Sequence, residues 1–90
     1  MEMKFALIYD PDVIKYDIPL LDQAIKERIK KAIESKLLVH PEVFGKHLRK
    51  SLKGYLKLRV GDYRVVFSIE KTIIRIIAIQ HRSIIYKKFL

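Results

Sequence analysis

The sequence predicts a small α+β domain, in which an N-terminal strand and two helices pack on a twisted antiparallel sheet of about four strands. Two observations support this fold class. Residues 20–37 carry apolar side chains at three- and four-residue spacing, which is typical of an amphipathic helix. Residues 55–81 contain three runs with alternating or dense apolar residues, separated by short turns, which is typical of an antiparallel meander. A short helical turn is expected at the C-terminal end.

The composition limits the class of protein. The 90 residues are enough for one domain, so we expect residues 1–90 to form a single unit. The absence of cysteine excludes a disulfide framework and a zinc–thiolate site, and it fits a reducing cytoplasm. We expect no signal peptide, because the N-terminal stretch MEMKFALIYDPD has no basic region leading a long apolar run. We also expect no membrane association, because no apolar stretch reaches the roughly 18 residues that a membrane span needs.

The charge is large and unevenly distributed. The formal net charge is +9, with a net of −1 over residues 1–45 and of +10 over residues 46–90. Such a basic half favours a polyanionic partner, with nucleic acid as the first candidate. The alternative is a soluble protein with an ordinary lysine-rich surface.

The first half of the chain reads as a strand followed by two helices. A strand is expected at residues 4–9 and a short helix at residues 13–16, with Asp10 as its N-cap and Pro11 at its first position. Asp17-Ile18-Pro19 should end that helix. The long helix at 20–37 has an apolar stripe that needs a partner: Leu21, Ala24, Ile25, Ile29, Ala32, Ile33 and Leu37.

Residues 39–53 read as a connector. Pro41 should end the long helix at His40, since the residue before proline avoids helical geometry. Residues 41–44 can form a short helical turn, and residues 45–50 are basic and expected to be a loop.

A hairpin follows at residues 55–69. Gly61-Asp62 suits a two-residue type II′ turn, which pairs Val60 with Tyr63, Arg59 with Arg64 and Lys57 with Val66. One face then carries Leu56, Leu58, Val60, Tyr63, Val65 and Phe67, and the other carries Tyr55, Lys57, Arg59, Arg64 and Ser68. Two arginines placed opposite one another repel. We therefore expect an anion to bind on their face.

The third strand of the meander is expected at residues 72–81, after a turn at Glu70-Lys71. This register puts Ile74, Ile76 and Ala78 on the face toward the helix, and Ile73, Arg75, Ile77, Ile79 and His81 on the face of Arg64. A loop longer by one residue would invert the assignment. Ser83 is a candidate cap for a helical turn at residues 84–89.

The side chains that could carry chemistry are Lys57, Arg64, His81, Arg82 and Tyr86. A guanidinium can bind two phosphate oxygens at once, and histidine titrates near neutrality. Each also has an ordinary structural reading: a surface cation, a histidine at a strand end, or a tyrosine covering the core. His40 and His47 lack a carboxylate at ligand spacing, so no metal site is expected. Asp10, Asp12 and Asp17 read as caps and turn residues.

The segments KLRVGDYRVVF and IIRIIAIQHRSIIY resemble the C-terminal half of the RelE/ParE superfamily of toxins from toxin–antitoxin pairs. The resemblance rests on Leu58-Arg59, on residues 61–64, and on His81-Arg82 with Tyr86, and it extends over nearly the whole chain. It implies the RelE-like fold. RelE-type members cleave mRNA in the ribosomal A site without metal or cofactor, using the substrate's 2′-hydroxyl.

The resemblance also implies roles for residues. Lys57 matches a lysine that serves the attacking oxygen, and Arg64 matches the arginine that binds the phosphate. Arg82 matches the arginine beside the leaving group, and Tyr86 the tyrosine that orients the nucleotide. His81 matches a proposed acid or base. Five further residues of the basic half are expected to bind RNA or phosphate: Tyr55, Arg59, Lys46, Arg49 and Lys53.

The expected function is therefore that of a cytoplasmic toxin, a ribosome-dependent mRNA endonuclease. Its expected partners are a cognate acidic antitoxin, mRNA in the A site and ribosomal RNA along the basic face. Two alternatives stay open. ParE-type members share the scaffold but inhibit DNA gyrase by binding it, and the chain could also be a non-catalytic RNA- or ribosome-binding module.

Overall fold

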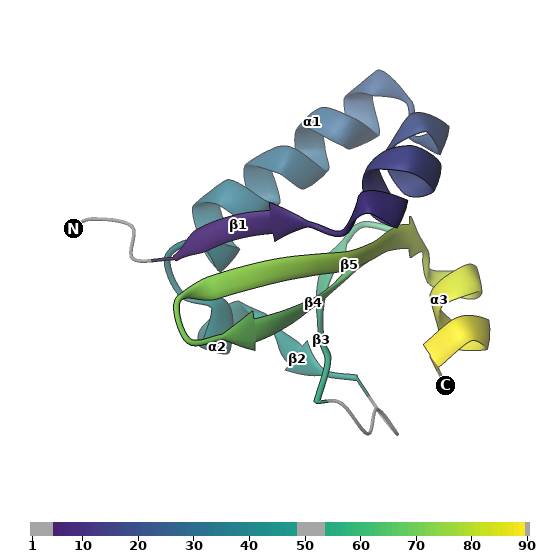
Figure 1. The fold of residues 1–90 in the computed structure, drawn as a ribbon. Helices are drawn as coiled ribbons and strands as arrows, with labels where there is room; N and C mark the ends of the chain where they lie inside the picture. Colours follow the sequence, from purple (N-terminus) through teal and green to yellow (C-terminus); the bar gives the residue numbers. More distant parts are fainter. Residues whose placement is uncertain (1–4, 49–53, 90) are drawn as a thin grey trace.

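The computed structural model describes residues 5–48 and 54–89, and it confirms the α+β class. A five-stranded sheet has the order β1-β5-β4-β3-β2, with α1 lying over one face and α3 at the other face near the end of β5 (Figure 1). The strands are β1 (Ala6–Tyr9), β2 (Lys46–His47), β3 (Leu56–Val60), β4 (Tyr63–Glu70) and β5 (Ile73–His81).

The sheet has five strands because one further strand pairs with each edge of the β3-β4-β5 meander: β1 with β5, and β2 with β3. β1 pairs in parallel with β5, while all other pairs are antiparallel. β2 was expected to be part of a basic loop, and that expectation is wrong: Lys46 and His47 pair with Lys57 and Leu56 of β3. β2 pairs with these two residues and so leaves the Arg59 end of β3 unpaired on that side.

The N-terminal helical region begins as the sequence predicts. The Asp10 side chain accepts the backbone N–H of Asp12 at 3.0 Å, as an N-cap should. A π-helical turn, η1 (Val13–Asp17), follows and runs directly into a 3₁₀ turn, η2 (Ile18–Leu20), so Pro19 does not end the helical path. The path ends at Leu21, which has extended backbone angles.

The long helix begins later than predicted. α1 (Gln23–Ala32) starts after Asp22, whose side chain accepts the backbone N–H of Ile25 at 2.9 Å. It continues as a π-helical turn, η3 (Ile33–Leu37), and Pro41 then opens the short helix α2 (Pro41–Phe44) as expected. None of the helices within residues 5–48 and 54–89 is long and apolar enough to cross a membrane.

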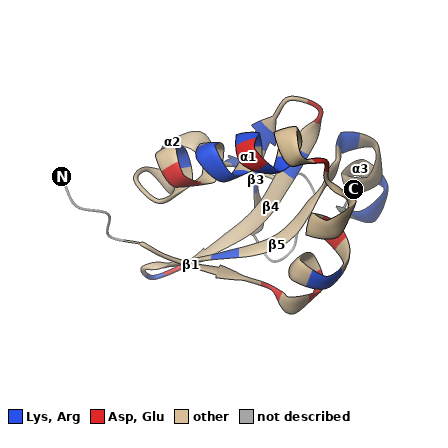
Figure 2. Cartoon of the chain, turned by 90° about the horizontal axis from the view of Figure 1, so that it is seen from above, with Lys and Arg blue, Asp and Glu red and all other residues tan. Residues whose placement is uncertain are grey.

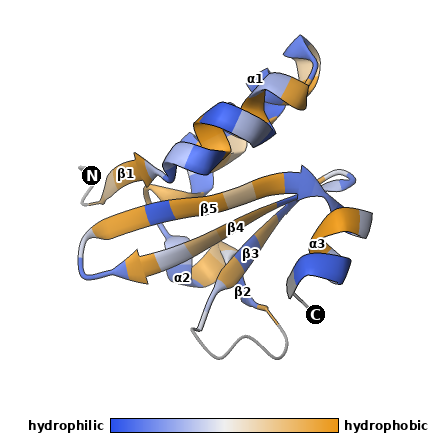
Figure 3. Cartoon of the chain, turned by 45° about the vertical axis from the view of Figure 1, so that its right-hand side comes forward, coloured by the Kyte–Doolittle hydropathy of each residue, from blue (hydrophilic) through white to orange (hydrophobic). Residues whose placement is uncertain are grey.

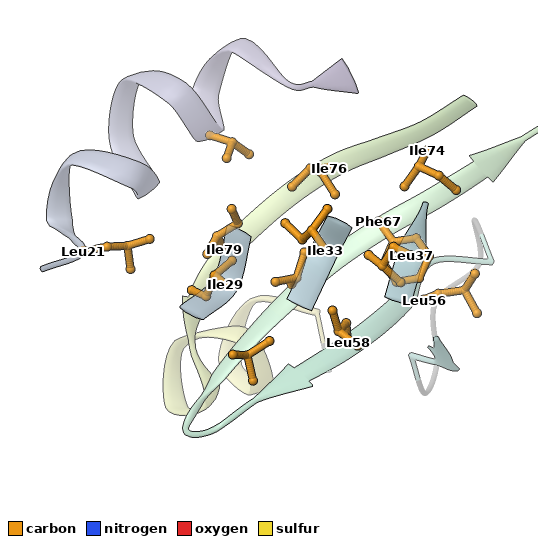
Figure 4. Close-up of a cluster of buried hydrophobic side chains, with 13 residues drawn as sticks. Leu21, Ile29, Ile33, Leu37, Leu56, Leu58, Phe67, Ile74, Ile76 and Ile79 are labelled. Carbon is orange, nitrogen blue, oxygen red and sulfur yellow. The ribbon is translucent and has the colours of Figure 1, made fainter. Parts of the chain in front are cut away.

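The main core lies between the helical layer and the sheet. Most of the predicted helical stripe is buried there against β3, β4 and β5, as Figure 4 shows. Ala24 is an exception and is exposed. Burial of one such leucine or isoleucine stabilises the fold by about 1.5–3 kcal/mol. The residues of this cluster are Val13, Leu21, Ile29, Ile33, Leu37, Leu56, Leu58, Val60, Val65, Phe67, Ile74, Ile76 and Ile79.

A second, smaller core lies on the opposite face of the sheet. Ile85 of α3 (Arg82–Phe89) is fully buried and packs with Leu48, Val66 and Ala78. The dense apolar stretches of β4 and β5 in Figure 3 reflect this burial on both faces. The second core therefore fixes α3 against the sheet.

The register of the first hairpin is confirmed. Val60 pairs with Tyr63, Arg59 with Arg64, and Lys57 with Val66. Gly61 has φ +61° and Asp62 does not have a positive φ, as a type II′ turn requires. The next turn falls one residue later than predicted, at Lys71-Thr72, because Glu70 pairs with Ile73.

The register of β5 changes at a bulge. Val66 pairs with Ala78 and Phe67 with Ile76, so Ile77 is an extra residue between them. Ile74 and Ile76 therefore face α1, and Ile73, Arg75 and Ile77 face the other side, as predicted.

Beyond the bulge the alternation is inverted, and three assignments are wrong. Ala78 faces α3, whereas Ile79 packs in the main core. His81 pairs with Tyr63 and so lies on the face opposite to Arg64. A bulge of one residue is enough to exchange the two faces of a strand.

Candidate functional site

A cavity of about 300 Å³ lies where the end of β3 meets the helical layer and α3. Six elements contribute to it: η3, α2, β2, β3, β4 and α3. None of the described residues that line it is acidic. The lining residues are Lys36, Phe44, Lys46, Lys57, Leu58, Arg59, Arg64 and Tyr86.

The strand register concentrates the positive charge. Lys46 lies directly opposite Lys57, and Arg59 lies directly opposite Arg64, so two like-charge pairs stand side by side on β2, β3 and β4. Like charges in directly opposed positions destabilise a sheet. Figure 2 shows further Lys and Arg residues on α1 and α3. The arrangement is one that an anion would stabilise.

Arg64 occupies the predicted face but is not exposed on it. Its side chain is only 4% exposed, and Nη1 donates to the carbonyl oxygens of Gly61 and Tyr63, both at 3.0 Å. The prediction of an exposed arginine is therefore wrong, because α3 packs over this end of β4. These two hydrogen bonds and the burial hold the guanidinium, and therefore its positive charge, in a fixed position in the cavity wall.

Tyr86 lies on α3, one residue after the buried Ile85, and its side chain is 38% exposed. A hydrogen bond with the Arg64 side chain is the largest effect on the Tyr86 phenol and lowers its pKa. Burial opposes this shift, and the charges of Arg64, Lys57 and Arg82 add to it. Lys57 Nζ lies 5.6 Å from the centre of the Tyr86 ring. Lys57, Arg64 and Tyr86 therefore form one connected group.

His81 has a different position and a visible structural role. Its Nδ1 accepts the backbone N–H of Ser83 at 3.2 Å and lies 3.0 Å from the Ser83 hydroxyl. The imidazole, rather than Ser83 as predicted, thus caps the first turn of α3. The ring also contacts Tyr63 edge-on at 5.6 Å and lines a separate cavity of about 150 Å³. The structure does not bring His81 together with Lys57 and Arg64.

The remaining predicted residues divide into three groups. Lys46 and Arg59 line the cavity, and the charge of Arg82 reaches Tyr86 from the first turn of α3. Tyr55 is half-buried against the second core and lines another cavity with Glu70 and Arg75. Arg49 and Lys53 lie outside the described residues. In the part of the chain that is described, no three His, Asp or Glu side chains gather closely enough to hold a metal ion.

Sequence reasoning missed three lining residues: it gave no site role to Lys36 and Phe44, and it placed Leu58 only on the apolar face of the hairpin. Lys36 lies in the last turn of η3, and Phe44 ends α2. A signal for Phe44 was present, since it is the one aromatic residue between Tyr16 and Tyr55 and it precedes a glycine. The sequence had no signal that would place it beside the hairpin.

Comparisons with known proteins agree with the resemblance seen in the sequence. The chain is similar in structure to the toxin in the RelBE2 toxin–antitoxin complex from Mycobacterium tuberculosis, with a TM-score of 0.79, 24% identity, and coverage of 92% of this chain and 97% of that chain. It is also similar to a chain of the RelB–RelE complex from Methanococcus jannaschii, with a TM-score of 0.68, 22% identity, and coverage of 92% and 99%.

A third similar structure is the Escherichia coli toxin RelE in complex with an antitoxin peptide, with a TM-score of 0.66, 23% identity, and coverage of 98% and 96%. These matches show the fold. No curated protein sequence matches the chain.

A family model described as the ParE toxin of the type II toxin–antitoxin system parDE matches residues 8–86. That match spans β1 to α3 and includes every described residue that lines the basic cavity. The chain therefore belongs to the ParE toxin family of type II toxin–antitoxin systems, within the RelE/ParE superfamily.

Proposed function

We propose that this toxin is a cytoplasmic mRNA endonuclease. It cleaves mRNA in the ribosomal A site, without a metal ion. The observation that carries the proposal is the basic cavity, in which five cations and a tyrosine converge and no described lining residue is acidic. A phosphodiester is the ligand that such a lining suits best, because the cations offset its charge and a nucleobase can stack on the ring.

The proposed reaction is an attack by the ribose 2′-oxygen on the adjacent phosphorus. The bond from the 2′-oxygen to phosphorus forms and the bond to the 5′-oxygen breaks, which gives a 2′,3′-cyclic phosphate and a free 5′-hydroxyl. The proton leaves the 2′-hydroxyl, and one proton is delivered to the departing 5′-oxygen. Extra negative charge develops on the phosphorane between these events, and fixed cations stabilise it best when they need no rearrangement.

The geometry suggests how these tasks are divided. Lys57 and Tyr86, in contact through the cation–π pair, lie where they can hold the nucleotide and exchange a proton with the 2′-oxygen. Buried Arg64 supplies charge behind them and makes the Tyr86 phenol more acidic. Arg82, on the same helix, is assigned to the leaving-group side. Lys46 and Arg59 bind neighbouring phosphates.

His81 has no direct part in this scheme. It lies on the other face of the sheet and caps α3, so we assign to it the positioning of Tyr86 through the helix. This differs from the acid or base role that the resemblance implies.

We also propose that a cognate acidic antitoxin covers the basic face. The support is the charge of the C-terminal half and the fact that the similar structures are complexes of toxins with RelB antitoxins. The antitoxin would occupy the surface that RNA needs and would thereby inhibit the toxin.

A second candidate function is inhibition of DNA gyrase by binding. It is favoured by one observation, the match to a ParE family model over residues 8–86. A gyrase inhibitor would act through a protein-binding surface and would not depend on the contact between Lys57 and Tyr86. A non-catalytic RNA-binding module is the third possibility, and it would bind RNA without cleaving it.

Primer extension on mRNA from cells that express the toxin separates these functions. The endonuclease predicts cuts within translated codons, lost in Lys57→Gln and Tyr86→Phe but retained in the control Lys31→Gln on the exposed side of α1. Intact mRNA together with a loss of supercoiling activity in purified gyrase would instead establish the gyrase inhibitor. Intact mRNA with RNA binding that weakens steeply as salt increases would establish the binding module.

A further inference from the structure

We infer that Phe44 and Lys36 form a second nucleotide-stacking subsite in the basic cavity, beside the one at Tyr86. The inference rests on the proposed function and adds to it a pair of RNA-binding residues from the helical layer. Lys36 Nζ lies 5.7 Å from the centre of the Phe44 ring, which nearly equals the 5.6 Å between Lys57 Nζ and the Tyr86 ring. The cavity is thus lined by two lysine–aromatic pairs.

Each pair offers what one nucleotide requires. The aromatic ring provides a surface on which a base stacks, and the ammonium group offsets the charge of a neighbouring phosphate. Phe44 is 40% exposed and Tyr86 is 38% exposed, so both rings are accessible to a ligand. A large apolar ring that is left exposed among cations contributes little to the core, which makes a binding role the better explanation.

The backbone holds Phe44 in place. It is the last residue of α2, whose first residue, Pro41, is fully buried. Gly45 follows, and its backbone N–H donates to the Pro41 carbonyl at 2.9 Å. A Cβ at Gly45 would overlap Cζ of Phe67, so only glycine permits this close approach to the core. The stacking surface is therefore fixed to a rigid element.

Lys36 is positioned by a different part of the fold. It precedes Leu37, which is fully buried in the main core, at the end of η3. The two proposed subsites thus come from opposite layers: Lys36 and Phe44 from the helical layer, and Lys57 and Tyr86 from the sheet and α3. An RNA segment with two consecutive nucleotides is the ligand that would occupy both subsites. Its phosphates would lie against Lys46 and Arg59, which line the same cavity.

The absence of tryptophan from the sequence permits a direct test. Phe44→Trp places a single indole at the proposed subsite, and Val43→Trp, at a neighbouring position that is 66% exposed and outside the cavity lining, is the matched control. The probe is an RNA trinucleotide with 2′-O-methyl groups, which cannot undergo attack by the 2′-oxygen. An abasic trimer with the same phosphates tests whether the base is needed.

The expected result is saturable quenching of the indole in Phe44→Trp by the trinucleotide, weaker by about tenfold or more for the abasic trimer, and no saturable quenching in Val43→Trp. Phe44→Ala should weaken trinucleotide binding by about tenfold, and Phe44→Tyr should restore it. The KM for mRNA cleavage on ribosomes should also be higher in Phe44→Ala than in the wild type and should return toward the wild-type value in Phe44→Tyr.

Two results would overturn the inference and leave the proposed function intact. One is trinucleotide binding, measured by calorimetry, that depends on Lys57 and Tyr86 but leaves the indole of Phe44→Trp unquenched. The other is a Phe44→Ala variant that loses antitoxin binding while its RNA affinity is unchanged, which would make Phe44 a protein contact. If the wild-type protein neither binds the trinucleotide nor cleaves mRNA, both the proposed function and the inference are wrong.

Discussion

Lys46 of β2 lies directly opposite Lys57 of β3, at the edge of the sheet where the basic cavity opens. Both side chains line that cavity, and the neighbouring position repeats the pattern with Arg59 opposite Arg64. In the absence of a ligand this arrangement costs stability, since each like-charge pair is unfavourable. We expect a polyanion to bind at this position and to offset the repulsion within the two pairs.

The first prediction concerns this cost. Lys46→Gln should increase the free energy of unfolding by about 0.5 kcal/mol at low salt, because it removes one like-charge pair, and the gain should shrink at high salt through screening. Urea denaturation measures both effects. Lys31→Gln, which removes an exposed charge from the last turn of α1, should give no gain. A less stable Lys46→Gln protein would show that the two lysines do not repel one another.

The second prediction concerns two tyrosines with opposite pKa shifts. The pKa of Tyr86 lies below the ordinary tyrosine value of about 10, chiefly through its hydrogen bond with Arg64, whereas burial and the nearby Glu34 raise the pKa of Tyr9 above that value. A lowered pKa means that the Tyr86 contribution to stability grows as the pH rises from its folded pKa toward about 10. A raised pKa means that the Tyr9 contribution is lost as the pH rises from about 10 through its folded pKa.

Tyr86→Phe and Tyr9→Phe should therefore change the alkaline stability profile in opposite senses. The phenolate absorbance should also appear at lower pH for Tyr86 than for Tyr9. Arg82→Gln should move the Tyr86 titration upward, because one nearby positive charge is lost. Titration of Tyr86 above the ordinary value in the wild-type protein would contradict the contact with Arg64.

The third prediction separates a capping role of His81 from a catalytic one. His81→Asn keeps a side-chain acceptor for the Ser83 N–H, so stability and mRNA cleavage should remain close to those of the wild type. His81→Ala loses the acceptor and should cost about 1 kcal/mol of stability. Cleavage that is lost equally in both variants, at a temperature where His81→Asn is fully folded, would instead assign the imidazole to the chemistry.

The fourth prediction concerns Gly45. Gly45→Ala places a Cβ against the Phe67 ring and should destabilise the fold by about 1–3 kcal/mol, as overpacking of a core does. Gly54→Ala is a useful comparison, because its Cβ meets nothing within 4 Å and any cost arises from its φ of +70° alone. Thermal denaturation of both variants provides the measurement. A smaller loss in Gly45→Ala than in Gly54→Ala would contradict the close approach.

The sequence predicts the first hairpin well because its register is determined locally. Gly61-Asp62 allows a two-residue turn, and such a turn leaves one possible pairing for Arg59 and Arg64. The helix and its buried stripe were also predictable, because Ile29, Ile33 and Leu37 repeat at helical spacing.

The faces of β5 beyond Ile77 could not be predicted. A bulge leaves no mark in a strand in which six of the nine residues are isoleucine or alanine, and both faces of this strand carry buried residues. The shift placed His81 away from the cavity. The burial of Arg64 was hidden for a related reason, since it depends on the position of α3, which Ile85 determines through long-range packing.

Single-turnover cleavage of mRNA on purified ribosomes tests the central claim most directly. We expect Lys57→Met and Tyr86→Phe each to slow cleavage by about 100-fold or more, as loss of a group that acts on the reacting atoms does, while Lys31→Gln cleaves at the wild-type rate. Cleavage at the wild-type rate by the folded double variant of Lys57 and Tyr86 would contradict the claim that the basic cavity holds the scissile phosphodiester.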